Sequence, residues 1–234
     1  MKNIDVSHID LLRLFNFGES LLHPDLETIL MQIPKQSFTV GAVGIHTNGQ
    51  YFNEEQLTAI FKTGVLNVLT VSCDGNGTPE EYERLRPPAK WDVLLHFLVK
   101  AKELRDKYAP SITLRTETIC GKVGEQERWK KIVRPLGWEP QFRSYKILSG
   151  AVRNKDHENP SIPEGICAWV HPQRLFVDCE CNVIPCCAHP QAFIFGNLKK
   201  QKYGEILFGR KRRLFVKKAE KRREMPICKE CGEP

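Results

Sequence analysis

The sequence predicts an α/β protein with a parallel sheet in its first two thirds and a small cysteine-rich module at its C-terminus. From residue 8 to 120, short apolar strands alternate with amphipathic helices. The strands are nearly continuous apolar runs, as expected for a parallel sheet covered on both faces. Seven of the nine cysteines fall between Cys167 and Cys231. Such clustering predicts a metal module.

The expected elements follow one another closely. Pro24 and Asp25 suit the first turn of a helix, and Asn53 and Gly64 suit the two ends of the next helix. Because parallel strands need crossover connections, this order predicts a parallel sheet. The elements are strand 9–17, helix 23–33, strand 39–49, helix 53–64, strand 65–75, helix 90–109 and strand 111–119.

Beyond residue 120 the pattern loosens. A helix at 125–137 and a strand at 140–147 could complete the sheet, and a polar, proline-containing linker follows. We place the domain boundary near residue 155, which gives domains 1–155 and 156–234. The second domain is expected to hold a β-hairpin at 174–187 that turns around Glu180 to Asn182, one basic helix at 202–223, and a final CxxC pair.

Composition limits the compartment and the partners. The chain has 234 residues, 41% of them hydrophobic, which suffices for one sizeable core and a small module. No apolar run approaches the roughly 20 residues of a membrane span, and the start of the chain lacks the pattern of a signal peptide. We therefore expect a cytoplasmic protein without a membrane partner, in which cysteines bind metals, catalyse or lie buried rather than form disulfides.

Polar residues follow three of the predicted strands directly. In a parallel α/β sheet or barrel, the carboxyl ends of the strands build the ligand site. We therefore expect these residues to lie together around one ligand site at the carboxyl end of the sheet. They are Gly18, Glu19 and Ser20; Thr47, Asn48 and Gly49; and Ser72, Cys73, Asp74 and Gly75.

Four cysteines could surround one metal centre. Cys228 and Cys231 form a CxxC pair, Cys167 precedes the predicted hairpin, and Cys186 closes it. Thiolates without a well-placed histidine suit either zinc or an iron–sulfur cluster, and spacing alone does not separate the two. Inert, buried cysteines are the alternative.

The other cysteines of the hairpin leave alternatives open. Neighbouring side chains on a strand face opposite ways, so Cys187 is an alternative ligand to Cys186, which follows Pro185. Cys179 and Cys181 share a strand face and could serve a second centre.

The positive charge is local. The net charge of the chain is +7, yet residues 199–223 contain twelve Lys and Arg against two Glu, so the remainder is slightly acidic. Such a segment is either a solvated helix face or a surface for nucleic acid, an acidic partner or a membrane.

Several segments resemble, in order along the chain, the radical S-adenosylmethionine (radical SAM) enzymes that carry a C-terminal SPASM or shorter twitch domain. The strongest likeness is the C-terminal signature, in which a Cys, a hairpin ending in Cys, a Gly-Asn-Leu segment and a final CxxC follow one another. The segments are LLRLFNFGESLLHPDL, IHTNG, VSCDG with EEYERLR, LFVDCECNVIPCC, FGNLKKQKYGEIL and CKEC.

This resemblance implies a partial (β/α) TIM-like barrel, without its first strand and helix, followed by a hairpin-plus-helix cluster domain. It implies one auxiliary [4Fe-4S] cluster on Cys167, Cys186, Cys228 and Cys231. Gly18, Glu19 and Ser20 take the place of the family's GGEP-like motif, with Glu19 as partner of the S-adenosylmethionine ammonium group. Thr47, Asn48, Ser72 and Asp74 would then lie beside the methionyl and ribose parts.

The resemblance also implies a reaction. The intact system would take an electron from a reductant such as flavodoxin or ferredoxin and cleave S-adenosylmethionine to a 5′-deoxyadenosyl radical, which abstracts hydrogen from a peptide or small-molecule substrate. The auxiliary cluster would bind that substrate or take an electron from it.

The family's CxxxCxxC motif, whose cysteines bind the catalytic cluster, is absent from the sequence. Cys73 and Cys120 are isolated on separate elements and cannot replace it. We expect a fragment or a misplaced start at Met1, one partner of a split protein, or a relative without the chemistry. In each case this chain alone would not cleave S-adenosylmethionine, and a missing N-terminal segment or split partner would cover the open edge of its first strand.

Two rival functions remain. One is a zinc-ribbon module that binds nucleic acid through the basic 199–223 segment. A zinc ribbon gives no reason for polar residues to converge at the strand ends of the α/β domain. We therefore do not expect nucleic acid to be the partner. The other is a non-catalytic scaffold or peptide-binding subunit.

Overall fold

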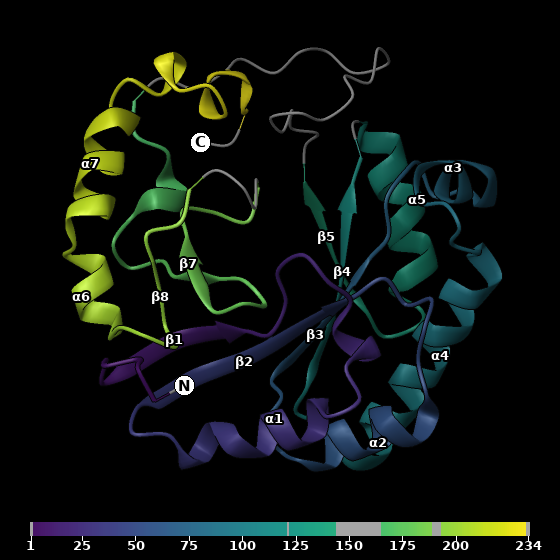
Figure 1. The fold of residues 1–234 in the computed structure, drawn as a ribbon. Coiled ribbons are helices and arrows are strands. Elements are labelled where there is room, and N and C mark those ends of the chain that lie inside the picture. Colours follow the sequence, from purple (N-terminus) through teal and green to yellow (C-terminus); the bar gives the residue numbers. More distant parts are fainter. Residues whose placement is uncertain (1, 121, 144–164, 189–192, 233–234) are drawn as a thin grey trace. The chain divides into compact units, whose positions relative to one another are not determined.

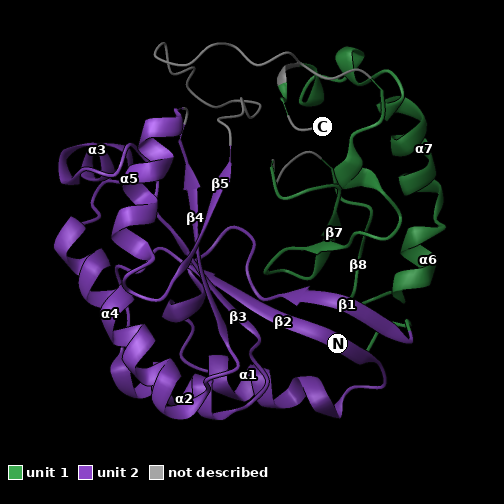
Figure 2. Cartoon of the chain, turned by 180° about the vertical axis from the view of Figure 1, so that it is seen from behind, with its two compact units in different colours: residues 1–6, 145–234 green, residues 7–144 purple. Residues whose placement is uncertain are grey.

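The chain folds as two compact units. The structure is a computed structural model that describes residues 2–120, 122–143, 165–188 and 193–232. One unit consists of residues 7–144, and the other combines residues 1–6 with residues 145–234 (Figure 2). The expected boundary near residue 155 lies outside the described residues. The domain limits 1–155 and 156–234 therefore stay a prediction.

The first unit is built on a five-stranded parallel sheet. The strands lie in sequence order, β1-β2-β3-β4-β5, and each neighbouring pair is parallel. Figure 1 shows the helices of this unit along one side of the sheet, as right-handed crossovers in a single direction require. The predicted partial (β/α) barrel is therefore confirmed. Its strands are β1 His8–Arg13, β2 Thr39–Thr47, β3 Val68–Ser72, β4 Thr113–Ile119 and β5 Glu139–Arg143.

The helices of this unit begin at residues that suit a helix start. The Asn53 side chain accepts hydrogen bonds from the backbone amides of Glu55 and Gln56, at 2.8 and 3.1 Å. Thr78 caps in the same way a short helix that the sequence pattern did not predict. The helices are α1 Leu26–Gln32, α2 Glu54–Lys62, α3 Pro79–Leu85, α4 Trp91–Tyr108 and α5 Val123–Val133, with 3-10 turns at Ser20–Leu22 and Ile33–Lys35.

The two faces of the sheet differ in burial. On β3, Leu69 and Val71 are fully buried, whereas Thr70 and Ser72, on the opposite face, are only partly buried. The apolar face and the helices together form the main core. The expectation that both faces are covered is wrong for β1, where Leu11 is 44% exposed. On β4 the less buried (open) face carries Arg115 and Glu117, whereas Thr116 and Thr118 are fully buried on the core face beside Leu114.

The second unit contains a small antiparallel sheet. Strands β6 (Phe176–Val177) and β7 (Asn182–Ile184) form the predicted hairpin, and β8 (Gly196–Asn197) adds a third strand that was not predicted. Cys181 lies in the hairpin turn with a φ of 68°, a left-handed conformation that side chains rarely adopt. A second core packs beneath the sheet, and Cys167 contacts it. Its buried members are Val170, Val183, Phe195, Ile206, Phe215 and Ala219.

The basic segment forms two helices instead of one. Helix α6 covers Tyr203–Leu207 and helix α7 covers Arg210–Ala219. Gly209 lies between them with extended backbone, and a Cβ atom there would come within 2.8 Å of the Glu205 carbonyl oxygen. The extended backbone at Gly209 interrupts the predicted single helix, and the close approach of Glu205 leaves no room there for a larger residue. Two further 3-10 turns, at Arg222–Glu224 and Cys228–Glu230, follow α7, and one at Ala168–Val170 follows Cys167.

The N-terminus belongs to this second unit. The Asn3 side chain donates to the Leu198 carbonyl at 2.7 Å, and the Tyr203 amide donates to the Asn3 carbonyl at 2.8 Å. Asp5 accepts from the Gly204 amide at 2.8 Å. Residues near the start of the chain thus fix the first turn of α6.

None of the helices in the described ranges is both long and apolar enough to cross a membrane. The cytoplasmic location stays a prediction.

Candidate functional site

Glu19 links the ends of the first two strands. One oxygen of its carboxylate accepts from the Asn48 amide at 2.7 Å, and the other accepts from the Leu21 amide at 3.1 Å. Ser20 donates a hydrogen bond to the Leu14 carbonyl at 2.9 Å, so hydrogen bonds fix both ends of the loop that follows β1. The polar residues after β1 and β2 therefore lie side by side. Each carboxylate oxygen retains a second lone pair, so the role of Glu19 toward an ammonium group stays a prediction.

The loop after β2 is shaped by its own side chains. Thr47 accepts from the Gly49 amide at 3.1 Å, and Asn48 accepts from the Gln50 amide at 2.8 Å. Gly49 has a φ of 69°, and a Cβ atom there would lie 3.2 Å from Phe97. The left-handed backbone and the close approach of Phe97 both favour glycine at position 49.

Asp74 links the ends of β3 and β4. Its carboxylate accepts from the Ile119 amide at 2.9 Å and pairs with Arg86. The Trp129 indole, fully buried, donates to the Gly75 carbonyl at 2.8 Å. The loop that carries Ser72 and Asp74 is thus held from both sides. Hydrogen bonds thus join the carboxyl end of β1 to that of β2, and the carboxyl end of β3 to that of β4.

A charged cluster on the open face of the sheet was missed by the sequence analysis. His46 on β2 lies 3.5 Å from Glu117 on β4, and Arg143 on β5 pairs with the same carboxylate. Burial, followed by the nearby charges of Arg13 and Arg143, lowers the pKa of His46 to about 4. The alternation of polar and apolar residues along these strands was the sequence signal that could have predicted this cluster.

The two isolated cysteines of this unit are buried thiols. Cys73 is fully buried, which raises its pKa far above the usual range, and burial raises the pKa of Cys120 to about 11. Both are therefore protonated at neutral pH and have the character of core residues.

The four predicted ligand cysteines come from three parts of the second unit. Cys167 begins the 3-10 turn Ala168–Val170, and Cys186 follows β7 directly after Pro185. Cys228 opens the last 3-10 turn and Cys231 ends it, and the Cys231 amide donates to the Cys228 carbonyl at 3.2 Å. All four are partly buried.

The charges of these cysteines act on one another. Burial is the main effect that raises the pKa of Cys228 to about 11, followed by the negative charges of Cys186 and Cys231 and, more weakly, Cys167. Burial also raises the pKa of Cys167, with smaller contributions from Cys186 and Cys231. These effects are consistent with four thiols near one another, and the choice of Cys186 over Cys187 stays a prediction.

This donor set fits an iron–sulfur cluster. Four partly buried thiols beside a small apolar core are the ligands such clusters use. Within the described ranges, no three His, Cys, Asp or Glu side chains are close enough to hold one metal ion. A cluster binds each thiolate on a different iron, so its ligands stand farther apart than those of one ion. Assignment of the four cysteines as ligands stays a prediction.

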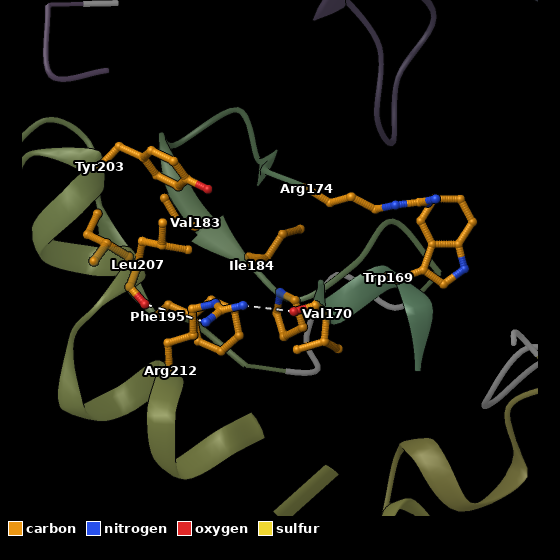
Figure 3. A pocket seen from close by; sticks show the side chains of 11 residues that line it. Trp169, Val170, Arg174, Val183, Ile184, Phe195, Tyr203, Leu207 and Arg212 are labelled. Carbon is orange, nitrogen blue, oxygen red and sulfur yellow. Dashed lines mark hydrogen bonds between the residues drawn. The ribbon is translucent and has the colours of Figure 1, made fainter. Parts of the chain in front are cut away.

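A small pocket elsewhere in the second unit carries no such ligands. It is lined by Trp169, Val183, Tyr203 and Arg212 among others, and Arg212 donates to the Val170 carbonyl at 2.8 Å (Figure 3). Its volume of about 10 Å³ leaves room for about one water molecule. The pocket is therefore too small for a substrate.

Comparison with known proteins agrees with this arrangement. Residues 167–232 match the sequence profile of the SPASM family, an iron–sulfur cluster-binding domain. No curated protein matches the chain by sequence.

Solved structures extend the likeness to the whole chain. Native anSMEcpe with bound AdoMet has a TM-score of 0.65 and 15% identity, over 96% of this chain and 74% of that chain. The same protein with AdoMet and the Kp18Cys peptide has a TM-score of 0.65 and 15% identity, over 97% of this chain and 76% of that chain. BtrN in complex with AdoMet and 2-DOIA has a TM-score of 0.52 and 16% identity, over 95% and 72%.

The profile match and the shared fold confirm the expected resemblance. Residues 167–232 match the iron–sulfur cluster-binding SPASM domain, and the chain as a whole shares its fold with anSMEcpe and BtrN.

Proposed function

We propose that this chain binds one auxiliary [4Fe-4S] cluster through Cys167, Cys186, Cys228 and Cys231. The observation that carries the proposal is that four partly buried cysteines lie inside the segment that matches the SPASM profile. When bound, such a cluster supplies one-electron chemistry or a site for substrate. The chain's own contribution is to hold the four thiols in a partly buried, apolar surrounding.

The first unit would bind S-adenosylmethionine at the carboxyl ends of β1, β2 and β3. Glu19 would receive the ammonium group, with Gly18 and Ser20 beside it, while Thr47, Asn48, Ser72 and Asp74 would line the methionyl and ribose parts. Support comes from the hydrogen bonds of Glu19 and Asp74, which hold these loops together before any ligand arrives. The substrate would be a peptide or a small molecule; anSMEcpe, of similar fold, has been solved with a peptide.

Iron analysis tests the cluster. The full chain is purified without oxygen and reconstituted with iron and sulfide. We expect about four iron atoms per chain and a brown protein. Alanine at any of the four cysteines should abolish the colour, whereas Cys187→Ala, the matched control, should retain it. A colourless protein with stoichiometric zinc would contradict the proposal and favour the zinc ribbon.

S-adenosylmethionine binding is measured separately by equilibrium dialysis. Glu19→Gln should weaken binding about tenfold or more, because a charge-assisted hydrogen bond is lost. Unchanged affinity would exclude Glu19 as the ammonium partner. We expect no 5′-deoxyadenosine from this chain, whose sequence lacks CxxxCxxC.

A further inference from the structure

Arg222 is a buried charge in a basic segment whose other charges are largely exposed. Only 2% of its surface is accessible to solvent, and it is the only charged residue among the buried side chains of the described residues. It begins the 3-10 turn between α7 and the CxxC pair. Burial of a guanidinium is costly unless a negative group or several acceptors compensate it.

The contacts of Arg222 lead to the four cysteines. One terminal nitrogen of its guanidinium donates to the Cys231 carbonyl at 2.8 Å. Its positive charge also acts on Cys167 and Cys228, in the direction that favours their thiolates. The neighbouring Arg223 is exposed to solvent. Of two adjacent arginines, the fold thus turns one inward, toward the candidate ligands.

We propose that Arg222 is the counter-charge of the cluster, so that its buried positive charge raises the reduction potential of the centre on Cys167, Cys186, Cys228 and Cys231. This inference rests on the proposed function. A centre with four thiolate ligands is an anion, and uptake of one electron from an external donor adds one more negative charge without a change in bonds or protons. A fixed positive charge nearby stabilises the reduced form more than the oxidised form.

Arginine suits this role better than lysine or histidine would. Its guanidinium stays protonated at all working pH values, so the charge does not depend on the protonation of the surrounding thiols. Its several donors also allow it to hold the Cys231 backbone at the same time. Arg222 is therefore a positioning residue that acts through charge and not a ligand.

The experiment compares cluster-loaded variants of the full chain. The midpoint potential is measured by a dithionite titration followed by electron paramagnetic resonance, with iron content and circular dichroism as controls for loading and folding. Arg222→Gln should shift the potential to a more negative value, Arg222→Lys should keep it close to that of the wild type, and Arg223→Gln, which removes the same charge at an exposed site, should not shift it.

The outcomes separate the possible causes. An unchanged potential in loaded Arg222→Gln would overturn the inference. If Arg222→Gln cannot hold the cluster, the iron content of Arg222→Lys distinguishes the causes. Retention of iron in Arg222→Lys supports the role of the positive charge. Loss of iron in Arg222→Lys as well overturns the inference, because the shape of the arginine side chain would then be what the site requires. A wild-type chain without four irons contradicts the proposed function itself, which is a different result.

Discussion

Replacement of Trp129 by Phe should loosen the loop that carries Ser72 and Asp74. The substitution removes the indole N–H that donates to the Gly75 carbonyl and leaves that carbonyl without this partner in a buried site. An unsatisfied buried acceptor costs about 1–3 kcal/mol. The smaller ring also gives up apolar burial of about 1 kcal/mol. We therefore expect the free energy of unfolding to fall by about 2–4 kcal/mol, a large part of the stability of a typical domain.

The matched control is Trp138→Phe. Trp138 is equally buried, and its indole donates to the Leu98 carbonyl at 3.0 Å, in helix α4 and away from the strand ends. Urea denaturation should give similar losses for both variants, whereas affinity for S-adenosylmethionine should fall only for Trp129→Phe. A stability loss below about 0.5 kcal/mol for Trp129→Phe, within the range of ordinary surface substitutions, would refute the reasoning.

Three further predictions concern stability. Because His46 takes up a proton less readily in the folded chain, wild-type stability should be fully present above pH 6.5 and decline toward pH 4, by at most about 3 kcal/mol. His46→Gln should flatten this decline in urea titrations at pH 7.5 and 4.5, and equal slopes would contradict it. Cys181→Gly should raise the unfolding free energy by about 1 kcal/mol, since it relieves a left-handed turn, and should leave the iron content unchanged; loss of iron would instead indicate a second centre. Gly209→Ala should lower the thermal midpoint, because its Cβ would collide with the Glu205 carbonyl at a cost of about 1–3 kcal/mol, and an unchanged midpoint would show that the turn adapts.

Local patterns in the sequence were sufficient for most of the α/β unit. The strand expected at 39–49 lies at 39–47, and the long helix expected at 90–109 lies at 91–108. Apolar runs and capping residues specify helices and strands through positions that are close in the sequence, so these elements can be predicted from the sequence alone. The short helix α3 was missed because its seven residues are too few for a clear apolar period. The basic segment was wrongly predicted as one helix, because a single glycine within a helical pattern does not by itself show that the backbone becomes extended there.

The sequence by itself determined the fold class, the convergence of polar residues at the strand ends and the gathering of cysteines toward the C-terminus. Only the tertiary structure decided that His46 and Glu117 meet on the open face, that Asn3 and Asp5 belong to the C-terminal unit, and that Arg222 is buried while Arg223 is exposed. The physical reason is the distance along the chain. Contacts such as that of Asn3 with Leu198 join residues nearly 200 positions apart, and no local propensity or periodicity encodes which distant partner a polar side chain will find once the chain has closed.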